Sequence, residues 1–136
     1  MLELSTEATG LAGILMLAVV TIESGGWFLT RVATGDVPTT EFQRSFARAG
    51  HGMAGVLVTL GLVGVILTDA TTLDGFAGWV ARSGIPVAAI LMPAGFFLSS
   101  TGAGRTKPNG LVWLVWLGAL VLAAGAITLG IGLLTA

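Results

Sequence analysis

The sequence predicts an all-α integral membrane protein whose four transmembrane helices form an antiparallel bundle. Of its 136 residues, 54% are hydrophobic and only 10% are charged. A soluble chain of this length has too little interior to bury so much apolar surface. The apolar residues fall into four blocks, each close to the roughly 20 residues that cross a bilayer. We therefore expect a single transmembrane domain over residues 1–136, with helices near 9–31, 41–67, 85–101 and 111–134.

The first predicted helix, residues 9–31, carries one acidic side chain inside its apolar segment. This residue is Glu23, which lies about eight residues, or roughly 12 Å of helical rise, from the end of the helix. Trp27 and Arg31 suit the membrane interface, where an indole ring and a cation both reach water. An intramembrane carboxylate is costly unless it is paired, protonated or hydrated, so Glu23 is a functional candidate.

The second predicted helix, residues 41–67, begins with a capping box and carries a polar stripe. Thr40 followed by Gln43 is the pattern in which both side chains satisfy free backbone amides of the first turn. At 100° per residue, five residues fall within roughly an 80° arc of one face: Glu41, Arg44, Arg48, His51 and Gly55. A polar stripe that enters a membrane requires partners, and Glu23 of the preceding helix is the partner that we expect.

Two interpretations are open for residues 69–84, where apolar side chains recur at helical spacing: a short interfacial helix or a surface loop. In the third predicted helix, residues 85–101, a kink is expected at Pro93, which lacks a backbone donor. The fourth, residues 111–134, carries glycines seven residues apart, and small residues let helix backbones approach closely in lipid. Such glycines fit either a tight bundle or a homo-oligomer interface.

The basic residues predict the orientation of the chain. Five of the six lie in or beside the first and third connections, whereas only Arg82 lies near the second. Basic residues accumulate on the cytoplasmic side of membrane proteins. We therefore expect a multi-pass protein of the cell (inner) membrane with the first and third connections in the cytoplasm and both termini outside. The five residues are Arg31, Arg44, Arg48, Arg105 and Lys107.

Composition excludes several classes of function. The formal net charge of −1 argues against a nucleic-acid partner. The chain has no cysteine and one histidine, so it has no disulfide, thiolate metal site, haem-attachment motif or bis-histidine haem within one chain. Neither a Walker loop nor a nucleophilic triad motif is present. We expect no cofactor and no metal, and the lipid bilayer is the first partner.

Glu23, Arg48 and His51 are predicted to converge where the first two helices meet. Glu23 and His51 would serve as an acid/base or hydrogen-bonding pair, since an imidazole exchanges protons near neutral pH. Arg48 would hold Glu23 ionised or meet an anionic group of a ligand. The alternative is a purely structural ion pair that holds the first helix against the second.

The aromatic and polar residues at the same level of the bundle also have two interpretations. They form either an interfacial belt or the walls of a pocket open to the cytoplasmic leaflet. In the second case Trp27, Met53, Ser99 and Trp113 would contact the ligand.

Residues 22–26, Ile-Glu-Ser-Gly-Gly, followed by Arg31 and Gly35, resemble the first helix of the small multidrug resistance transporters. Members of that family have four helices and an essential glutamate in the first, so the resemblance implies that Glu23 is a proton and substrate site. It covers one helix and the start of the connection after it. Arg48 and His51 in the second helix depart from the family's pattern, and so does the longer chain. The uneven distribution of basic residues between the two sides argues against insertion in both orientations, which some members of the family show.

The leading hypothesis is a membrane-embedded site for a lipophilic small molecule. If the protein is an enzyme, proton transfer is the chemistry that these residues favour, as in an isomerase, a cyclase or a hydrolase. One alternative is a small proton-coupled exporter that uses Glu23. Another is a non-catalytic assembly subunit, with a homo-oligomer as one form of it.

Overall fold

The computed structural model describes residues 3–136, and over that range the chain is helical with no strand. Each of the four long helices is long and apolar enough to cross a membrane. The all-α class and the four spanning-length helices are therefore confirmed, and they suggest a multi-pass membrane protein. The elements are α1 (Thr6–Ala33), α2 (Glu41–Thr68), α3 (Gly75–Ser99), the short 3-10 helix η1 (Gly110–Val112) and α4 (Trp113–Leu134).

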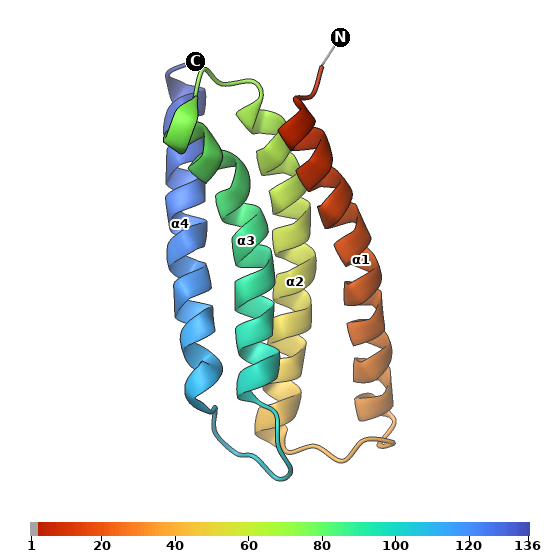
Figure 1. Ribbon diagram of the computed structural model, residues 1–136. Helices are drawn as coiled ribbons and strands as arrows, with labels where there is room; N and C mark the ends of the chain where they lie inside the picture. Colours follow the sequence, from red (N-terminus) through yellow and green to blue (C-terminus); the bar gives the residue numbers. More distant parts are fainter. Residues whose placement is uncertain (1–2) are drawn as a thin grey trace.

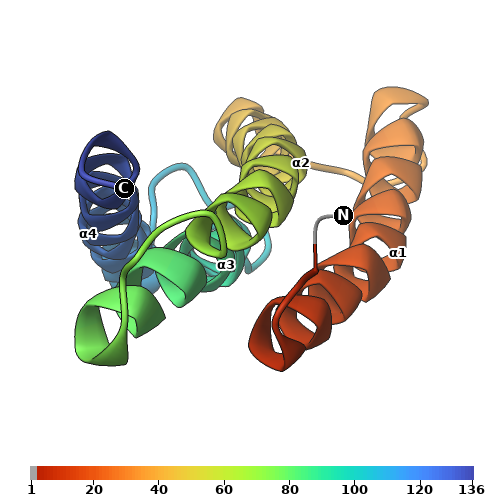
Figure 2. The ribbon, with the colours of Figure 1, turned by 90° about the horizontal axis from the view of Figure 1, so that it is seen from above.

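The helices lie in the order α4, α3, α2, α1 (Figures 1 and 2). Both α2 and α4 pack closely against α3, whereas α1 packs mainly against α2 and meets α3 only sparsely. Within the described residues α1 and α4 do not touch. Figure 1 shows both ends of the chain beside the α2–α3 connection, and the other two connections at the opposite end. The first helix is therefore the least supported of the four.

The third helix differs from the prediction, because α3 begins at Gly75 rather than near residue 85. Residues 75–84 are its first turns, so they form neither a separate interfacial helix nor a loop. Pro86 lies inside the helix and cannot donate a hydrogen bond to the Arg82 carbonyl. Burial of Ala81 and Ile85 keeps this segment helical despite the proline. Figure 2 shows the first turns of α3 directed away from the rest of that helix.

Close approach of backbones holds α3 to α4. A Cβ atom added at Gly84 would lie 2.7 Å from the Gly125 Cα, and one added at Gly125 would lie 2.9 Å from the Gly84 Cα. Gly118 and Gly132 are also buried, against Met92 and Leu73 respectively. The glycines spaced seven residues apart on α4 are therefore used within the chain.

A buried carboxylate joins three helices at the end of the molecule that holds the termini. Asp69, just after α2, accepts hydrogen bonds from the Ser5 amide (2.7 Å) and hydroxyl (3.0 Å) and from the Arg82 guanidinium (2.7 Å). Burial alone would raise the pKa of Asp69, but the hydrogen bonds from Ser5 and the charge of Arg82 outweigh it. The pKa of Asp69 consequently lies below its ordinary value. We call this group the Asp69 clasp.

The opposite end is held by the predicted capping box, which is present at Thr40 and Gln43. The Gln43 side-chain amide also donates hydrogen bonds to the carbonyls of Ser100 (3.0 Å) and Gly102 (2.7 Å). The Thr40 hydroxyl donates to the carbonyl of Arg105. The start of α2 is thereby bound to the connection between α3 and α4.

Candidate ligand-binding site

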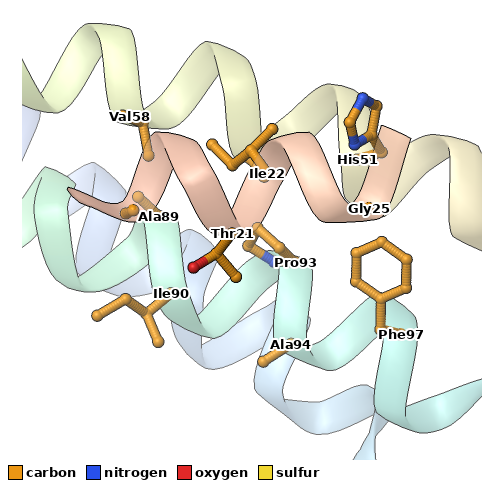
Figure 3. Close-up of a pocket in the computed structure, with 12 residues that line it drawn as sticks. Thr21, Ile22, Gly25, His51, Val58, Ala89, Ile90, Pro93, Ala94 and Phe97 are labelled. Carbon is orange, nitrogen blue, oxygen red and sulfur yellow. The ribbon is translucent and has the colours of Figure 1, made fainter. Parts of the chain in front are cut away.

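A cavity of about 350 Å³ lies between α1, α2 and α3. One cause is that α1 packs against α2 but only sparsely against α3. The other is that much of the lining consists of small alanine and glycine residues. Its size is at the lower end of the range typical of small-molecule sites. Figure 3 shows the side chains that surround it. They are Ala18, Thr21, Ile22 and Gly25 of α1, His51, Ala54 and Val58 of α2, and Ala89, Ile90, Pro93, Ala94 and Phe97 of α3.

His51 is the only titratable side chain that lines this cavity. Its ring lies on the backbone of α1, since a Cβ added at Gly25 would be 3.2 Å from the imidazole Nδ1 and one at Gly26 would be 3.4 Å from Cε1. The two adjacent glycines therefore make room for the ring. His51 is half-buried, and it has no hydrogen-bond partner among residues 3–136. Its polar ring atoms remain free for a ligand.

Two further polar groups belong to the walls of the cavity. The Thr21 hydroxyl of α1 has no hydrogen-bond partner within the described part of the chain. On α3, Pro93 has no N–H with which to satisfy the carbonyl of Ala89, and both residues line the cavity. His51 and Thr21 are thus the polar side chains of an otherwise apolar lining, and Ala89 adds a backbone carbonyl without its helical partner. A few polar groups among apolar walls are the usual composition of a site for a lipophilic molecule.

A second cavity, of about 360 Å³, adjoins the connections at the end of the molecule away from the termini. It shares Phe97 with the first cavity. Phe28 and Val32 of α1 form one side, and the residues that follow α3 form the other. Gln43 and Arg44 of α2 give this cavity a more polar lining than the first.

The structure does not bring the predicted trio together. Glu23 is exposed on α1, and Arg48 is exposed on α2. Neither forms an ion pair in the described range, where the two ion pairs are Arg44–Glu41 and Arg82–Asp69. The reason is rotational: Gly25 and Gly26 occupy the side of α1 that faces His51, and Glu23 lies on its flank. A pairing of Glu23 with Arg48 or His51 is therefore not formed.

The remaining predicted site residues lie outside the cavity. Trp27 is 65% exposed on α1, where the Arg31 guanidinium stacks over its ring at 5.3 Å, and Trp113 is 53% exposed on α4. Met53 packs against the apolar core. Ser99 is fully buried, and its hydroxyl donates to the carbonyl of Phe96. Of the side chains predicted from sequence, only His51 lines the site.

Sequence reasoning missed Thr21, Phe97 and the carbonyl of Ala89, which lacks its helical N–H partner. A threonine and a phenylalanine in a transmembrane helix carry no distinctive signal. Pro93 was an informative signal in the sequence. A proline inside a transmembrane helix leaves the carbonyl four residues earlier without its N–H partner, and it also allows a kink. No group of three or more histidine, aspartate or glutamate side chains in residues 3–136 could hold a metal ion.

The chain matches no protein-family model, no curated protein and no solved structure. The resemblance of residues 22–35 to small multidrug resistance transporters therefore has no family match behind it. The geometry of the cavities is the basis for the function proposed below.

Proposed function

We propose that this protein binds a lipophilic small molecule in the cavity between α1, α2 and α3, with His51 as its hydrogen-bonding partner. The observation that carries the proposal is the placement of one imidazole, with no partner of its own in the described residues, at one end of an apolar cavity of about 350 Å³. A ligand reaches this space from the bilayer between α1 and α3, which are the two walls that scarcely touch.

The three polar groups define what the ligand carries. An imidazole donates or accepts, a threonine hydroxyl does both, and a carbonyl accepts. A hydroxyl or carbonyl group on the ligand suits His51, and a second donor suits the Ala89 carbonyl. If a reaction takes place, His51 is the group that would transfer the proton. Glu23 is left out of this proposal because its side chain is exposed on the flank of α1.

Saturable photolabelling tests the proposal. The probe is palmityl alcohol with a diazirine in its chain, added to the protein in lipid nanodiscs, and labelled peptides are mapped by mass spectrometry. We expect labelling of α3 near Ala94 to saturate with probe concentration, whereas labelling of lipid-exposed surfaces rises linearly. Ala94→Phe fills the cavity and should abolish the saturable part. Ala126→Phe adds the same ring to the exposed side of α4 and should preserve it.

The contribution of His51 is measured in the same assay. His51→Phe retains an aromatic ring and removes the hydrogen bond. The probe concentration at half-saturation should therefore rise about two- to tenfold, as for the loss of one hydrogen bond of 0.5–1.5 kcal/mol. A wild-type protein that shows only linear labelling, or an Ala94→Phe variant that labels like wild type, would contradict the proposal.

A second candidate function, assembly with another membrane helix, is favoured by the exposure of Glu23. A carboxylate on the outer side of a transmembrane helix is costly without a partner. A second copy of this chain offers one, because Arg48 is exposed as well. Light scattering after gel filtration in mild detergent measures the mass. We expect an oligomer for wild type and a shift toward monomer for Glu23→Gln, and a monomeric wild-type protein would exclude this function.

A further inference from the structure

The two cavities are neighbours, and both lie against α1, α2 and α3. They share Phe97, whose ring lies at the His51 end of the first cavity in Figure 3. The ring also rests on α2, since a Cβ added at Gly50 would lie 3.1 Å from its Cε2. On the other side of Phe97, the second cavity adjoins the connections that precede α2 and follow α3. The Phe97 side chain is therefore the boundary that the two cavities share.

The two cavities differ in polarity. Around the first cavity the lining is apolar except for its three hydrogen-bonding groups. The lining of the second includes Gln43, Arg44 and residues 100–103. Gln43 is fully used, because its amide donates to two carbonyls and its oxygen accepts from the Thr40 amide. Arg44 is the one charged side chain of this lining.

The guanidinium of Arg44 has donors that the protein does not use. One terminal nitrogen donates to Glu41 at 3.2 Å, and the Nε atom is buried without a hydrogen-bond partner among the described residues. A guanidinium carries five N–H groups. The Glu41 side chain is 83% exposed, and an exposed ion pair of this kind contributes little. The Arg44 side chain as a whole is 42% exposed, so its remaining N–H groups are accessible to an acceptor from outside the chain.

We propose that the occupant of the two cavities is a single-chain amphiphile with an anionic oxygen head group. Its head binds Arg44 through charge-assisted hydrogen bonds, and its hydrocarbon chain passes Phe97 into the apolar cavity, where a hydroxyl or carbonyl group on the chain would meet His51. This inference rests on the proposed function and adds the chemical class of the ligand. The carboxylate paired with Arg44 is that of Glu41, which is 83% exposed and is not part of the cavity lining.

Three matched probes test the charge of the head group: palmityl alcohol, palmitic acid and palmityl phosphate, each with the same diazirine. They are compared in nanodiscs of uncharged lipid at about pH 8.5, where both acids are ionised. We expect the acid or the phosphate to half-saturate the site at about tenfold lower concentration than the alcohol, as for a hydrogen bond to a charged group. Whichever of the two binds more tightly identifies the head group as carboxylate or phosphate.

Two variants assign the preference to Arg44. In Arg44→Gln the anionic probes should lose their advantage while palmityl alcohol still saturates, which shows that the cavity is intact. In Glu41→Gln the advantage should persist or increase, because the competing carboxylate is gone. Arg44→Lys keeps the charge, so it should retain part of the preference for the anionic probes over palmityl alcohol. This variant separates loss of charge from local disruption of the structure.

The outcomes separate this inference from the proposed function. Equal half-saturation by all three probes in wild type would overturn the inference and leave the apolar site standing. The inference would also be overturned if Arg44→Gln still bound the anionic probes more tightly than palmityl alcohol. Absence of saturable labelling by any of the three probes would overturn both.

Discussion

The α3–α4 pair and the α1–α2 pair use glycine in opposite ways. Between α3 and α4, Gly84 and Gly125 let two backbones meet so closely that no Cβ fits between them. On α1, Gly25 and Gly26 instead make room for the imidazole of His51, and a cavity follows on the side of α3. The same residue type therefore builds one half that is tightly packed and another that contains a cavity. Four predictions test this contrast.

The largest effect should come from enlarging a glycine in the packed half. In Gly125→Leu the new side chain meets the backbone of Gly84, which cannot move independently of α3. Overpacking of this kind should lower the free energy of unfolding by about 3 kcal/mol. Gly130→Leu is the matched control, because nothing lies within 4 Å of a Cβ at that position of the same helix. Unfolding in sodium dodecyl sulfate, followed by circular dichroism, measures both, and equal losses would contradict tight α3–α4 packing.

The Asp69 clasp should give the next largest effect, because it fixes the start of the loosely packed α1. The pKa of Asp69 is lowered in the folded protein, so its stabilising contribution is fully present above the ordinary value of 3.8. That contribution is lost as the pH falls through the lower folded-state value. Asp69→Asn should remove about 1–2 kcal/mol at neutral pH, as for hydrogen bonds to a charged group.

Hydrogen exchange at the N-terminal turns of α1 reports the loss at the Asp69 clasp. Exchange is expressed as protection relative to the intrinsic rate at each pH. Protection in wild type should fall in strong acid toward that of Asp69→Asn, whose own protection should change little with pH. A wild-type protein and variant that respond alike to acid would show that the Asp69 clasp is not the group that titrates.

A smaller effect is expected from Gly25→Ala in the half that contains the cavity. The added methyl group lies 3.2 Å from the imidazole Nδ1, but the half-buried ring of His51 can move into the adjoining cavity. The free energy of unfolding should fall by about 1 kcal/mol or less. Binding of palmityl alcohol should weaken more than stability does, since the ring is displaced into the ligand's space. A loss as large as that of Gly125→Leu would erase the contrast between the two halves.

The smallest effect on stability should come from Glu23→Gln. The exposed carboxylate makes no ion pair within residues 3–136, so the variant should unfold within about 0.5 kcal/mol of wild type. The same unfolding assay in sodium dodecyl sulfate measures it. A large loss would mean that Glu23 has a partner, and the association measurement would then identify it.

The helices could be predicted from sequence, and the site could be predicted only in part. Blocks of apolar residues and the capping box at Thr40 and Gln43 are local patterns, and the structure contains both. The start of α3 was wrong because Pro86 and the charged Arg82 suggest a boundary, whereas burial against neighbouring helices extends the helix through them.

Pairings between helices were harder to predict than the helices themselves. Glu23 and His51 lie at similar heights along the helix bundle. A rotation of α1 about its axis by less than a quarter turn would decide whether Gly26 or the Glu23 carboxylate faces α2. Hydropathy fixes depth and says little about rotation. The cavity also depends on the spacing between α1 and α3, which are not consecutive in the chain and whose separation no local pattern encodes.

The bonds from the start of α2 to the connection after α3 bear on how the protein is made. Gln43 finds its acceptors 57 and 59 residues further along the chain, and Thr40 finds its own 65 residues further. When the ribosome has delivered only the first two helices, these acceptors have not yet been synthesised. The bonds of Thr40 and Gln43 can therefore form only after the connection that follows α3 has been synthesised.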